Sequence, residues 1–230
     1  MDFFVLLFKY MDFKMTVSIS GQYSEKLNLS KMIKRGMDIL GSLTLLFLFS
    51  PLFLVLGLLV SLDGGPVFYR HKRIGRDGKP FGCLKFRTMI LGAEACLNEY
   101  LSYHPEQRAE WEREQKLAFD PRVTAIGNIL RRLSLDELPQ LVNVLLGEMS
   151  LVGPRPVTEG ELKHYGPAAA AYLAVRPGLT GPWQVSGRND VSYATRVAMD
   201  EAYVRNFSLW QDIIILLRTP GVVLSKKGAR

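Results

Sequence analysis

Cysteine and histidine are scarce in this 230-residue chain, and neither is spaced for metal binding. The two cysteines, Cys83 and Cys96, form no CxxC pair, so a disulfide framework and a zinc site are both unexpected. The three histidines are scattered without the spacing of metal ligands, and we assign them no role. Two thiols that stay reduced fit a domain on the cytoplasmic side of a cell.

The chain is basic, but it lacks the pattern of a nucleic-acid-binding protein. The formal net charge is +7 at pH 7, which favours binding to polyanions such as nucleic acid, anionic lipid or phosphorylated substrates. The sequence has no module of interleaved basic and aromatic residues, and it carries a long apolar segment. A nucleic-acid partner is therefore not expected.

The long apolar run does not fit a cleavable signal peptide. Residues 36–62 contain Asp38 as their only strongly polar residue, and it lies near the start. The run begins too far along the chain, is too long, and is followed by no small-residue cleavage site. It is long enough to cross a bilayer, which needs about 20 apolar residues.

The centre and the flanks of this run favour a segment that turns back within the membrane. Ser50-Pro51 lies near the middle, and proline bends a helix because it removes a backbone donor. A spanning helix should have more basic residues at one end, whereas both flanks are basic here: Lys26, Lys31, Lys34 and Arg35 before, and Arg70, Lys72, Arg73, Arg76 and Lys79 after. An ordinary transmembrane helix with a tolerated proline is the alternative.

The rest of the chain reads as one folded domain. Two β-prone runs flank Asp77-Gly78, a strong hairpin-turn signal. Residues 89–118 have a polar helical pattern that His104-Pro105 divides into two solvated helices. A later helix should end at Gly147, and residues 151–188 should be Gly- and Pro-rich loops.

These patterns divide the chain into three parts. We assign residues 1–30 to an N-terminal tail, residues 31–62 to a re-entrant membrane hairpin and residues 63–230 to a cytoplasmic catalytic domain. The C-terminal stretch carries Trp210 on an apolar face and ends in basic residues. It is either an interfacial helix on an anionic membrane or a helix packed on the domain's own core.

Residues 130–141 carry the acidic pair Asp136 and Glu137. Ser134 and Glu137 have capping-box spacing, which places Asp136 in the first turn of a helix. Pro139 favours a later helix start. In both cases the carboxylates lie near a helix N-terminus, where the dipole and free N–H groups stabilise anions and allow phosphate to dock.

Two adjacent acids close to Arg131 and Arg132 suit metal-assisted phosphoryl transfer. An ionised aspartate can attack phosphorus, while a divalent cation and guanidinium groups offset the charge of a diphosphate. The alternative is an ordinary helix start, where Asp and Glu are favoured in any protein.

Further cations are placed to hold phosphate oxygens. Arg155, Arg176 and Arg188 each lie in Gly- and Pro-rich backbone, which suits bidentate phosphate binding. Lys85 and Arg87 are two residues apart on a predicted strand and therefore share one face. A solvated edge strand is the alternative for this pair.

In their order, these motifs resemble the bacterial sugar transferases, the monotopic polyprenyl-phosphate phosphoglycosyl transferases. His71 departs from the pattern, because a glutamine is expected there. The likeness covers about residues 31–225 and includes KRGMDILGS, the Ser50-Pro51 break, GPVFYRHKRIGRDGKPFGCLKFRTM, DPRVTAIGNILRRLSLDELPQLVNVLLGEMSLVGPRP and RPGLTGPWQVSGR.

The resemblance implies an α+β, mainly helical, membrane-monotopic fold with a re-entrant helix-break-helix, a small β-hairpin or sheet and interfacial helices. It implies that Asp136 attacks the β-phosphorus of a UDP-hexose, expels UMP and passes the phosphosugar to polyprenyl (undecaprenyl) phosphate. Asp136 and Glu137 would bind Mg²⁺, and Glu137 would assist metal binding or position the acceptor. Phosphate contacts are expected from Lys85, Arg87, Arg131, Arg155, Arg176 and Arg188.

The likeness is to short members that initiate exopolysaccharide or capsule synthesis with galactose or glucose 1-phosphate, without the polytopic N-terminal domain of larger members. The expected location is the bacterial inner membrane with the site on its cytoplasmic face, and anionic lipid is an expected partner, with a homodimer left open. Two alternatives also stay open: a membrane scaffold without catalysis, and a direct one-step transfer without a covalent intermediate.

Overall fold

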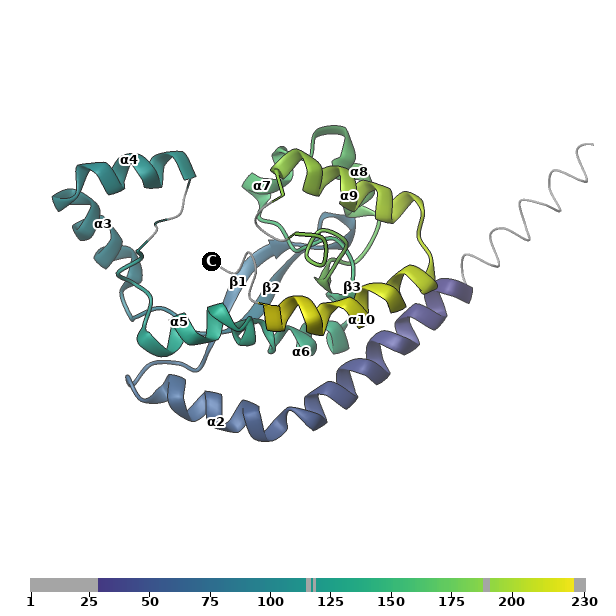
Figure 1. Cartoon of the computed structure of the whole chain (residues 1–230), viewed down its shortest axis with the longest axis horizontal. Coiled ribbons are helices and arrows are strands. Elements are labelled where there is room, and N and C mark those ends of the chain that lie inside the picture. The colour runs from purple at the N-terminus through teal and green to yellow at the C-terminus, as the bar shows by residue number, and fades with distance from the viewer. Residues whose placement is uncertain (1–28, 115–116, 118, 188–190, 226–230) are drawn as a thin grey trace, which may run out of the picture.

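The structure, a computed structural model, describes residues 29–114, 117, 119–187 and 191–225. It is a mainly helical α+β chain with two small sheets, which confirms the predicted class (Figure 1). Most of the proposed N-terminal tail, residues 1–28, lies outside the described residues. The proposed division of the chain into three parts stays a prediction.

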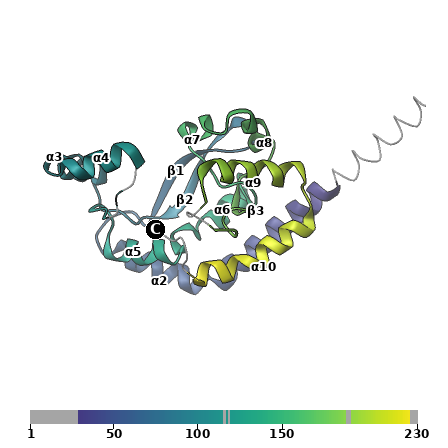
Figure 2. The same cartoon turned by 45° about the horizontal axis from the view of Figure 1, so that its top comes forward.

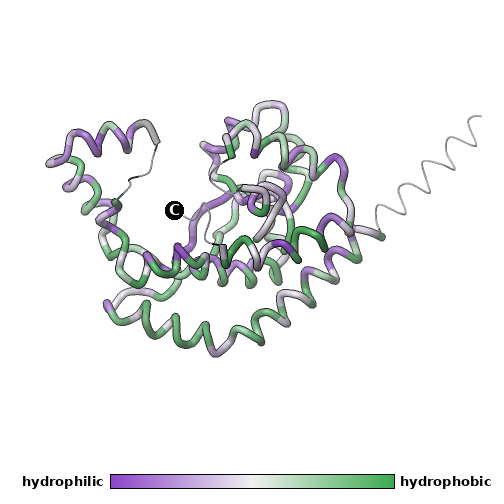
Figure 3. The backbone as a smooth tube through the Cα atoms, viewed as in Figure 1, coloured by the Kyte–Doolittle hydropathy of each residue, from purple (hydrophilic) through white to green (hydrophobic). Residues whose placement is uncertain are grey.

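The predicted membrane segment is a pair of helices with a bend between them. A helix over Leu29–Leu48 and α2 (Ser50–Ser61) meet at 64°. Among the described residues no single helix is long and apolar enough to span a bilayer. The two helices of this bent pair together are long and apolar enough, by length and composition alone. Figure 3 shows the apolar character continuing through the bend.

Proline chemistry explains the bend. Pro51 lies in the first turn of α2 and has no N–H to donate to the carbonyl of Phe47 four residues earlier. The hydroxyl of Ser50 donates to that carbonyl instead, at 2.8 Å. Phe49 between the two helices leaves the helical conformation, with φ −90° and ψ 3°. The predicted break at Ser50-Pro51 is confirmed to within one residue.

The first helix of the bent pair is tied to the rest of the chain by polar side chains. The Lys34 ammonium donates to the carboxylate of Asp212 at 2.6 Å and to the carbonyl of Val152 at 2.9 Å. The buried Asp38 accepts hydrogen bonds from the backbone N–H of Leu151 and the hydroxyl of Ser150, both at 2.9 Å. These bonds fix the orientation of the bent pair relative to the domain.

The expected β-hairpin is present as β1 (Phe68–Ile74) and β2 (Pro80–Phe86), which are antiparallel. Asp77 and Gly78 both have positive φ, 59° and 73°, as the predicted tight turn requires. The two predicted polar helices are α3 (Ala93–Tyr103) and α4 (Pro105–Glu114). They lie to one side of the remaining elements in both views (Figures 1 and 2).

The expectation of plain loops over residues 151–188 is wrong. Two short strands there, β3 (Ser150–Val152) and β4 (Gly178–Thr180), pair in parallel. Helices α7 (Glu159–Lys163) and α8 (Ala169–Leu173) connect them. Glycine and proline predicted irregular backbone, but pairing between segments far apart in sequence overrides local preference.

The main core lies between β2, β3 and three helices, α6 (Gln140–Leu146), α9 (Tyr193–Arg205) and α10 (Leu209–Ser225). The buried residues of this core are Cys83, Leu141, Val144, Met149, Leu151, Val152, Tyr203 and Ile215. Helix α6 ends at Gly147 with φ 81°, as predicted.

Helix α10 packs on the domain's own core, which is one of the two alternatives that the sequence left open. Its Ile215 is buried in the core and Asp212 binds Lys34, whereas Trp210, Leu217 and Leu224 are 67–78% exposed. These three residues are spaced by seven and therefore lie on one face of the helix. The helix thus packs on the domain and also exposes an apolar stripe.

Helix α5 (Ala125–Arg132) packs very closely on the chain that follows β2. The backbone N–H of Thr124 donates to the carbonyl of Thr88 at 3.0 Å, and a Cβ on Gly127 would lie 2.1 Å from that oxygen. Only glycine fits at this crossing, because any side chain would overlap a backbone atom.

We therefore expect Gly127→Ala to lower the free energy of unfolding by about 3 kcal/mol, because the overlap must push α5 away from Thr88. Gly160→Ala in α7 is the matched control, since the nearest atom to its Cβ would be the hydroxyl oxygen of Thr158 at 3.9 Å. Thermal unfolding of both variants in detergent checks this. Equal melting temperatures would contradict the close packing of α5.

Candidate active site

Asp136 and Glu137 lie in a short 3₁₀ turn, Leu135–Glu137, between α5 and α6. Ser134 has a left-handed backbone, with φ 56°, and its side chain makes no capping hydrogen bond. The predicted capping box is therefore wrong. Pro139 immediately precedes α6, so the helix starts after the acidic pair, as the proline indicated.

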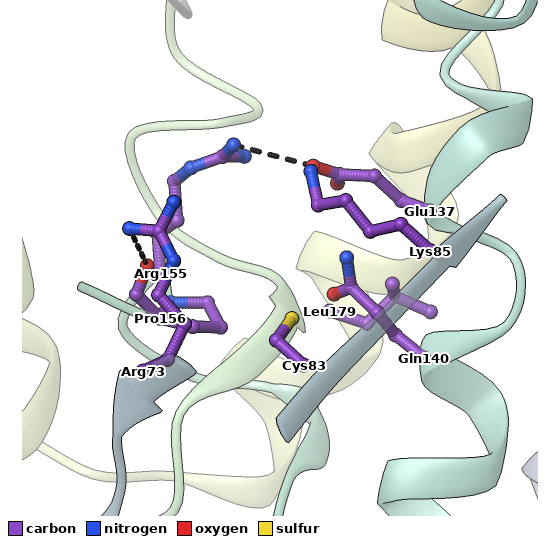
Figure 4. A pocket seen from close by; sticks show the side chains of 8 residues that line it. All are labelled: Arg73, Cys83, Lys85, Glu137, Gln140, Arg155, Pro156 and Leu179. Carbon is purple, nitrogen blue, oxygen red and sulfur yellow. Dashed lines mark hydrogen bonds and ion pairs between the residues drawn. The ribbon is translucent and has the colours of Figure 1, made fainter. Parts of the chain in front are cut away.

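Two cations from other parts of the chain meet at Glu137. The Lys85 ammonium on β2 lies 2.7 Å from Glu137 Oε1 and 3.7 Å from Asp136 Oδ2. Arg155, in the segment after β3, places Nη2 3.2 Å from the same Glu137 oxygen. Figure 4 shows both side chains converging on the Glu137 carboxylate. The structure thus brings together the predicted residues Lys85, Asp136, Glu137 and Arg155.

Arg131 is the predicted cation that belongs with Asp136. Its Nε donates to the hydroxyl of Thr88 at 2.9 Å. The negative charges of Asp136 and then Asp120 favour its ionised form, but Arg131 forms no ion pair within the described residues. Burial lowers the pKa of Arg131, but an arginine remains charged at any physiological pH.

The pKa values of the two carboxyl groups are shifted in opposite directions. Burial raises the pKa of Asp136, and the Glu137 charge adds to this rise against the attraction of Lys85 and Arg131. Burial also opposes ionisation of Glu137, but Lys85 and Arg155 outweigh it and lower its pKa to about 2. Glu137 is therefore firmly anionic, and Asp136 is the more basic of the two.

The small cavity in front of Glu137 includes residues that the sequence did not single out. Arg73 on β1 reaches it, and its Nη1 binds Glu161 at 2.6 Å and the carbonyl of Pro156 at 3.3 Å. Its alternation with His71 on β1 was the available signal, since strand register places both on the Lys85 face of the hairpin. The cavity is lined by Arg73, Cys83, Lys85, Glu137, Gln140, Arg155, Pro156 and Leu179 (Figure 4).

His71 lies beside this group of cations. Its Nδ1 is 3.4 Å from Arg73 Nη2. Burial lowers the pKa of His71, and the neighbouring charges of Arg73 and Lys85 lower it further. A neutral imidazole is therefore expected there at neutral pH.

Two of the arginines predicted to bind phosphate, Arg87 and Arg176, lie away from the acidic pair. Arg87 binds the Asp63 carboxylate and the carbonyls of Val60, Pro66 and Met89, so it fastens the end of α2 to the hairpin. Arg87 directly follows β2, and its backbone N–H still pairs with the carbonyl of Val67 at 2.9 Å, but its side chain binds Asp63.

Arg176 donates from Nε to the carbonyl of Gly147 at 2.6 Å. It lines a separate cavity of about 330 Å³ with the hairpin turn. The structure gives neither Arg87 nor Arg176 a contact with the acidic pair. Arg188 lies outside the described residues.

Comparison with known proteins shows which family the chain belongs to. A family model described as Bacterial sugar transferase matches residues 29–226. The exopolysaccharide production protein ExoY of Rhizobium meliloti is 56% identical over 197 residues, which cover 85% of this chain and 87% of that protein. The chain belongs to the bacterial sugar transferase family.

Two longer relatives are sugar transferases by name. The UDP-galactose-lipid carrier transferase of Erwinia amylovora is 54% identical over 200 residues, 87% of this chain and 42% of that protein. The undecaprenyl-phosphate galactose phosphotransferase of Salmonella typhimurium is 52% identical over the same shares of the two chains. This sugar transferase chain therefore spans less than half the length of these two relatives.

The acidic pair fits the way in which Mg²⁺ is usually bound. Magnesium takes one or two carboxylates together with substrate phosphates, rather than a cage of protein ligands. Asp136 and Glu137 supply two adjacent carboxylates that face the same ammonium group, Lys85. In the described part of this sugar transferase, no group of three or more His, Cys, Asp or Glu side chains is placed to hold a metal.

We predict that the pKa of Asp136 follows its neighbours in opposite directions. Glu137→Gln removes a negative charge and should lower it, whereas Lys85→Met removes a positive charge and should raise it. Carbodiimide reacts with protonated carboxyl groups, so the labelling of the Asp136 peptide against pH, read by mass spectrometry, measures both shifts. Glu201→Gln, at an exposed pair with Arg205, is the control. Shifts of the same sign would contradict the assignment.

Proposed function

We propose that this chain transfers a hexose 1-phosphate from a UDP-hexose to polyprenyl (undecaprenyl) phosphate, releasing UMP, as the first step of exopolysaccharide synthesis. The observation that carries the proposal is the pairing of Lys85 and Arg155 with Glu137 beside the buried Asp136, which is the more basic carboxyl group of the two. The names of the relatives support the donor and the acceptor, and two of them name galactose.

In the proposed first step, an Asp136 carboxylate oxygen attacks the β-phosphorus of the donor. A bond forms between that oxygen and phosphorus, the bond from phosphorus to the bridging oxygen breaks, and UMP leaves with the electron pair. Asp136 suits this role because burial makes it a better nucleophile than an ordinary exposed aspartate. Lys85, Arg131 and Arg155 offset the charge of the diphosphate.

In the proposed second step, an oxygen of polyprenyl phosphate attacks the phosphorus held on Asp136. The new phosphorus–oxygen bond forms the polyprenyl diphosphate sugar. The bond between phosphorus and the Asp136 oxygen breaks, and the electron pair returns to the Asp136 carboxylate. Glu137 is held by two cations and therefore stays ionised through both steps. It keeps Lys85 and Arg155 in place beside the reacting phosphate.

Mg²⁺ is the cofactor that we propose for this site, with Asp136 and Glu137 as its protein ligands. When bound, it would neutralise charge on the donor diphosphate. Lys85 lies close to both carboxylates, so the metal and this ammonium group would share them.

The exposed apolar side chains suit the surface of a membrane. The bent pair exposes Leu40, Phe47, Leu54, Leu58 and Leu62 at 68–84%, and α10 adds the stripe of Trp210, Leu217 and Leu224. Exposed apolar patches of this extent are rare on soluble monomers. We propose that the bent pair enters the inner membrane from the cytoplasmic side and returns, while α10 lies at the interface.

A lipid phosphate at the interface could then meet the site without leaving the bilayer. The net charge of +7 would attract both this acceptor and anionic lipid.

Purified protein in nanodiscs should release UMP continuously from UDP-galactose or UDP-glucose only when Mg²⁺ and undecaprenyl phosphate are both present. Asp136→Asn should lower the rate by at least about 10³-fold, because it removes the attacking oxygen charge. Asp77→Asn, in the exposed hairpin turn, is the matched control and should retain full activity. A wild-type rate matched by Asp136→Asn would refute the proposal.

Both ends of the bent pair should lie on one side of the membrane. Met32→Cys and Leu62→Cys, at positions that are 71% and 79% exposed, test this in a Cys96→Ser background in which the remaining Cys83 is buried. An impermeant maleimide should label both in inverted inner-membrane vesicles and neither in intact spheroplasts. Labelling of the two positions from opposite sides would show a spanning helix instead.

A further inference from the structure

Thr88 holds a fixed position where the chain that follows β2 crosses α5. Its side chain is 8% exposed, and its carbonyl oxygen accepts the backbone N–H of Thr124 at 3.0 Å. Gly127 lies directly against the same carbonyl. Backbone contacts on both sides leave this residue little freedom to move.

The hydroxyl of Thr88 is directed at a cation of the active site. Its Oγ1 accepts a hydrogen bond from Arg131 Nε at 2.9 Å. Arg131 lies in the last turn of α5, five residues before Asp136. This bond is the one hydrogen bond that the Arg131 side chain makes within the described residues, so its two terminal nitrogens are left for other partners.

The division of cations within the site shows why this bond matters. Lys85 and Arg155 both lie on Glu137, so they are already held by a firm anion. Within the part of the chain that the structure describes, Arg131 forms no ion pair, and the charges that favour its ionised form are those of Asp136 and then Asp120. A long side chain held at Nε loses most of its rotamer freedom, and its terminal nitrogens then face one direction.

We propose that Thr88 is a positioning residue for phosphosugar transfer: its hydroxyl fixes the Arg131 guanidinium so that the terminal nitrogens serve Asp136 and the phosphate that Asp136 attacks. This inference rests on the proposed function for its catalytic consequence. The hydrogen bond between Thr88 and Arg131 is a property of the protein alone, and its effect on the binding of a diphosphate can be measured without turnover.

Thr88→Val keeps the shape of the side chain and removes the hydroxyl. It should lower kcat/KM for UMP release about tenfold, the effect of losing one orienting hydrogen bond to a charged group. Thr88→Ser keeps the hydroxyl and should restore most of the rate. Thr180→Val is the matched control, because Thr180 is also buried and binds another hydroxyl, that of Thr219, away from the site.

Arg131→Ala tests whether Thr88 acts through Arg131. In the Arg131→Ala background, Thr88→Val should have no further effect on kcat/KM, since the group that it positions is already gone. If the two losses multiply, or if Thr88→Ser is as impaired as Thr88→Val, Thr88 acts only on folding and the proposal fails.

Binding of UDP gives a readout that needs no turnover. Thr88→Val should raise the Kd for UDP, measured by titration calorimetry, by about tenfold, because a displaced Arg131 no longer offers its terminal nitrogens to the diphosphate. Thr88→Ser should restore the Kd, and Thr180→Val should leave it unchanged. An unchanged Kd in Thr88→Val would overturn the positioning role, whereas a raised Kd in a protein whose wild type releases no UMP from a UDP-hexose would leave the link intact and reject the proposed function.

Discussion

The contact of Lys85 and Arg155 with one carboxylate, Glu137, is the interaction on which the site depends. Two adjacent carboxyl groups that are both largely buried repel each other, and burial disfavours the charge of each. Because the two cations meet at Glu137, that group stays ionised while Asp136 becomes the more basic partner. The same contact joins three parts of the chain: strand β2, the turn before α6 and the segment that follows β3.

The surrounding core and its hydrogen bonds hold these three parts in fixed positions relative to one another. The core between β2, α6 and β3 fixes Lys85 and the acidic turn relative to Arg155. Asn143 on α6 joins β2 by accepting the N–H of Leu84 and donating to the carbonyl of Gly82, both at 2.9 Å. Buried amide bonds of this kind specify one register of a strand against a helix. Lys34 and Asp38 connect the bent helix pair to the same core, so the proposed membrane anchor and the site form one unit.

Local signals in the sequence predicted the features that depend on local chemistry. The hairpin turn at Asp77-Gly78, the break at Ser50-Pro51 and the helix end at Gly147 each follow from the conformational limits of glycine or proline. The sequence also singled out Asp136, Glu137, Lys85 and Arg155, which the structure brings together, while their catalytic roles stay a prediction.

Other features depend on partners far away in sequence. The structure places Asp63 against Arg87 and the carbonyl of Gly147 against Arg176, and their phosphate contacts stay a prediction. Ser134 had the spacing of a capping residue, but its left-handed backbone turns the chain before α6 and directs the pair toward Lys85. A parallel pairing of two three-residue strands leaves too short a pattern to recognise in a sequence.

The most direct test of this account is the identity of the residue that carries the phosphosugar. Protein incubated with Mg²⁺ and UDP-hexose, without lipid acceptor, would be digested rapidly and its adduct located by tandem mass spectrometry. The account predicts a hexose phosphate on Asp136, which is abolished in Asp136→Asn and retained on Asp136 in Lys85→Arg. An adduct on Glu137, or UMP release that requires the acceptor and leaves no adduct, would contradict it.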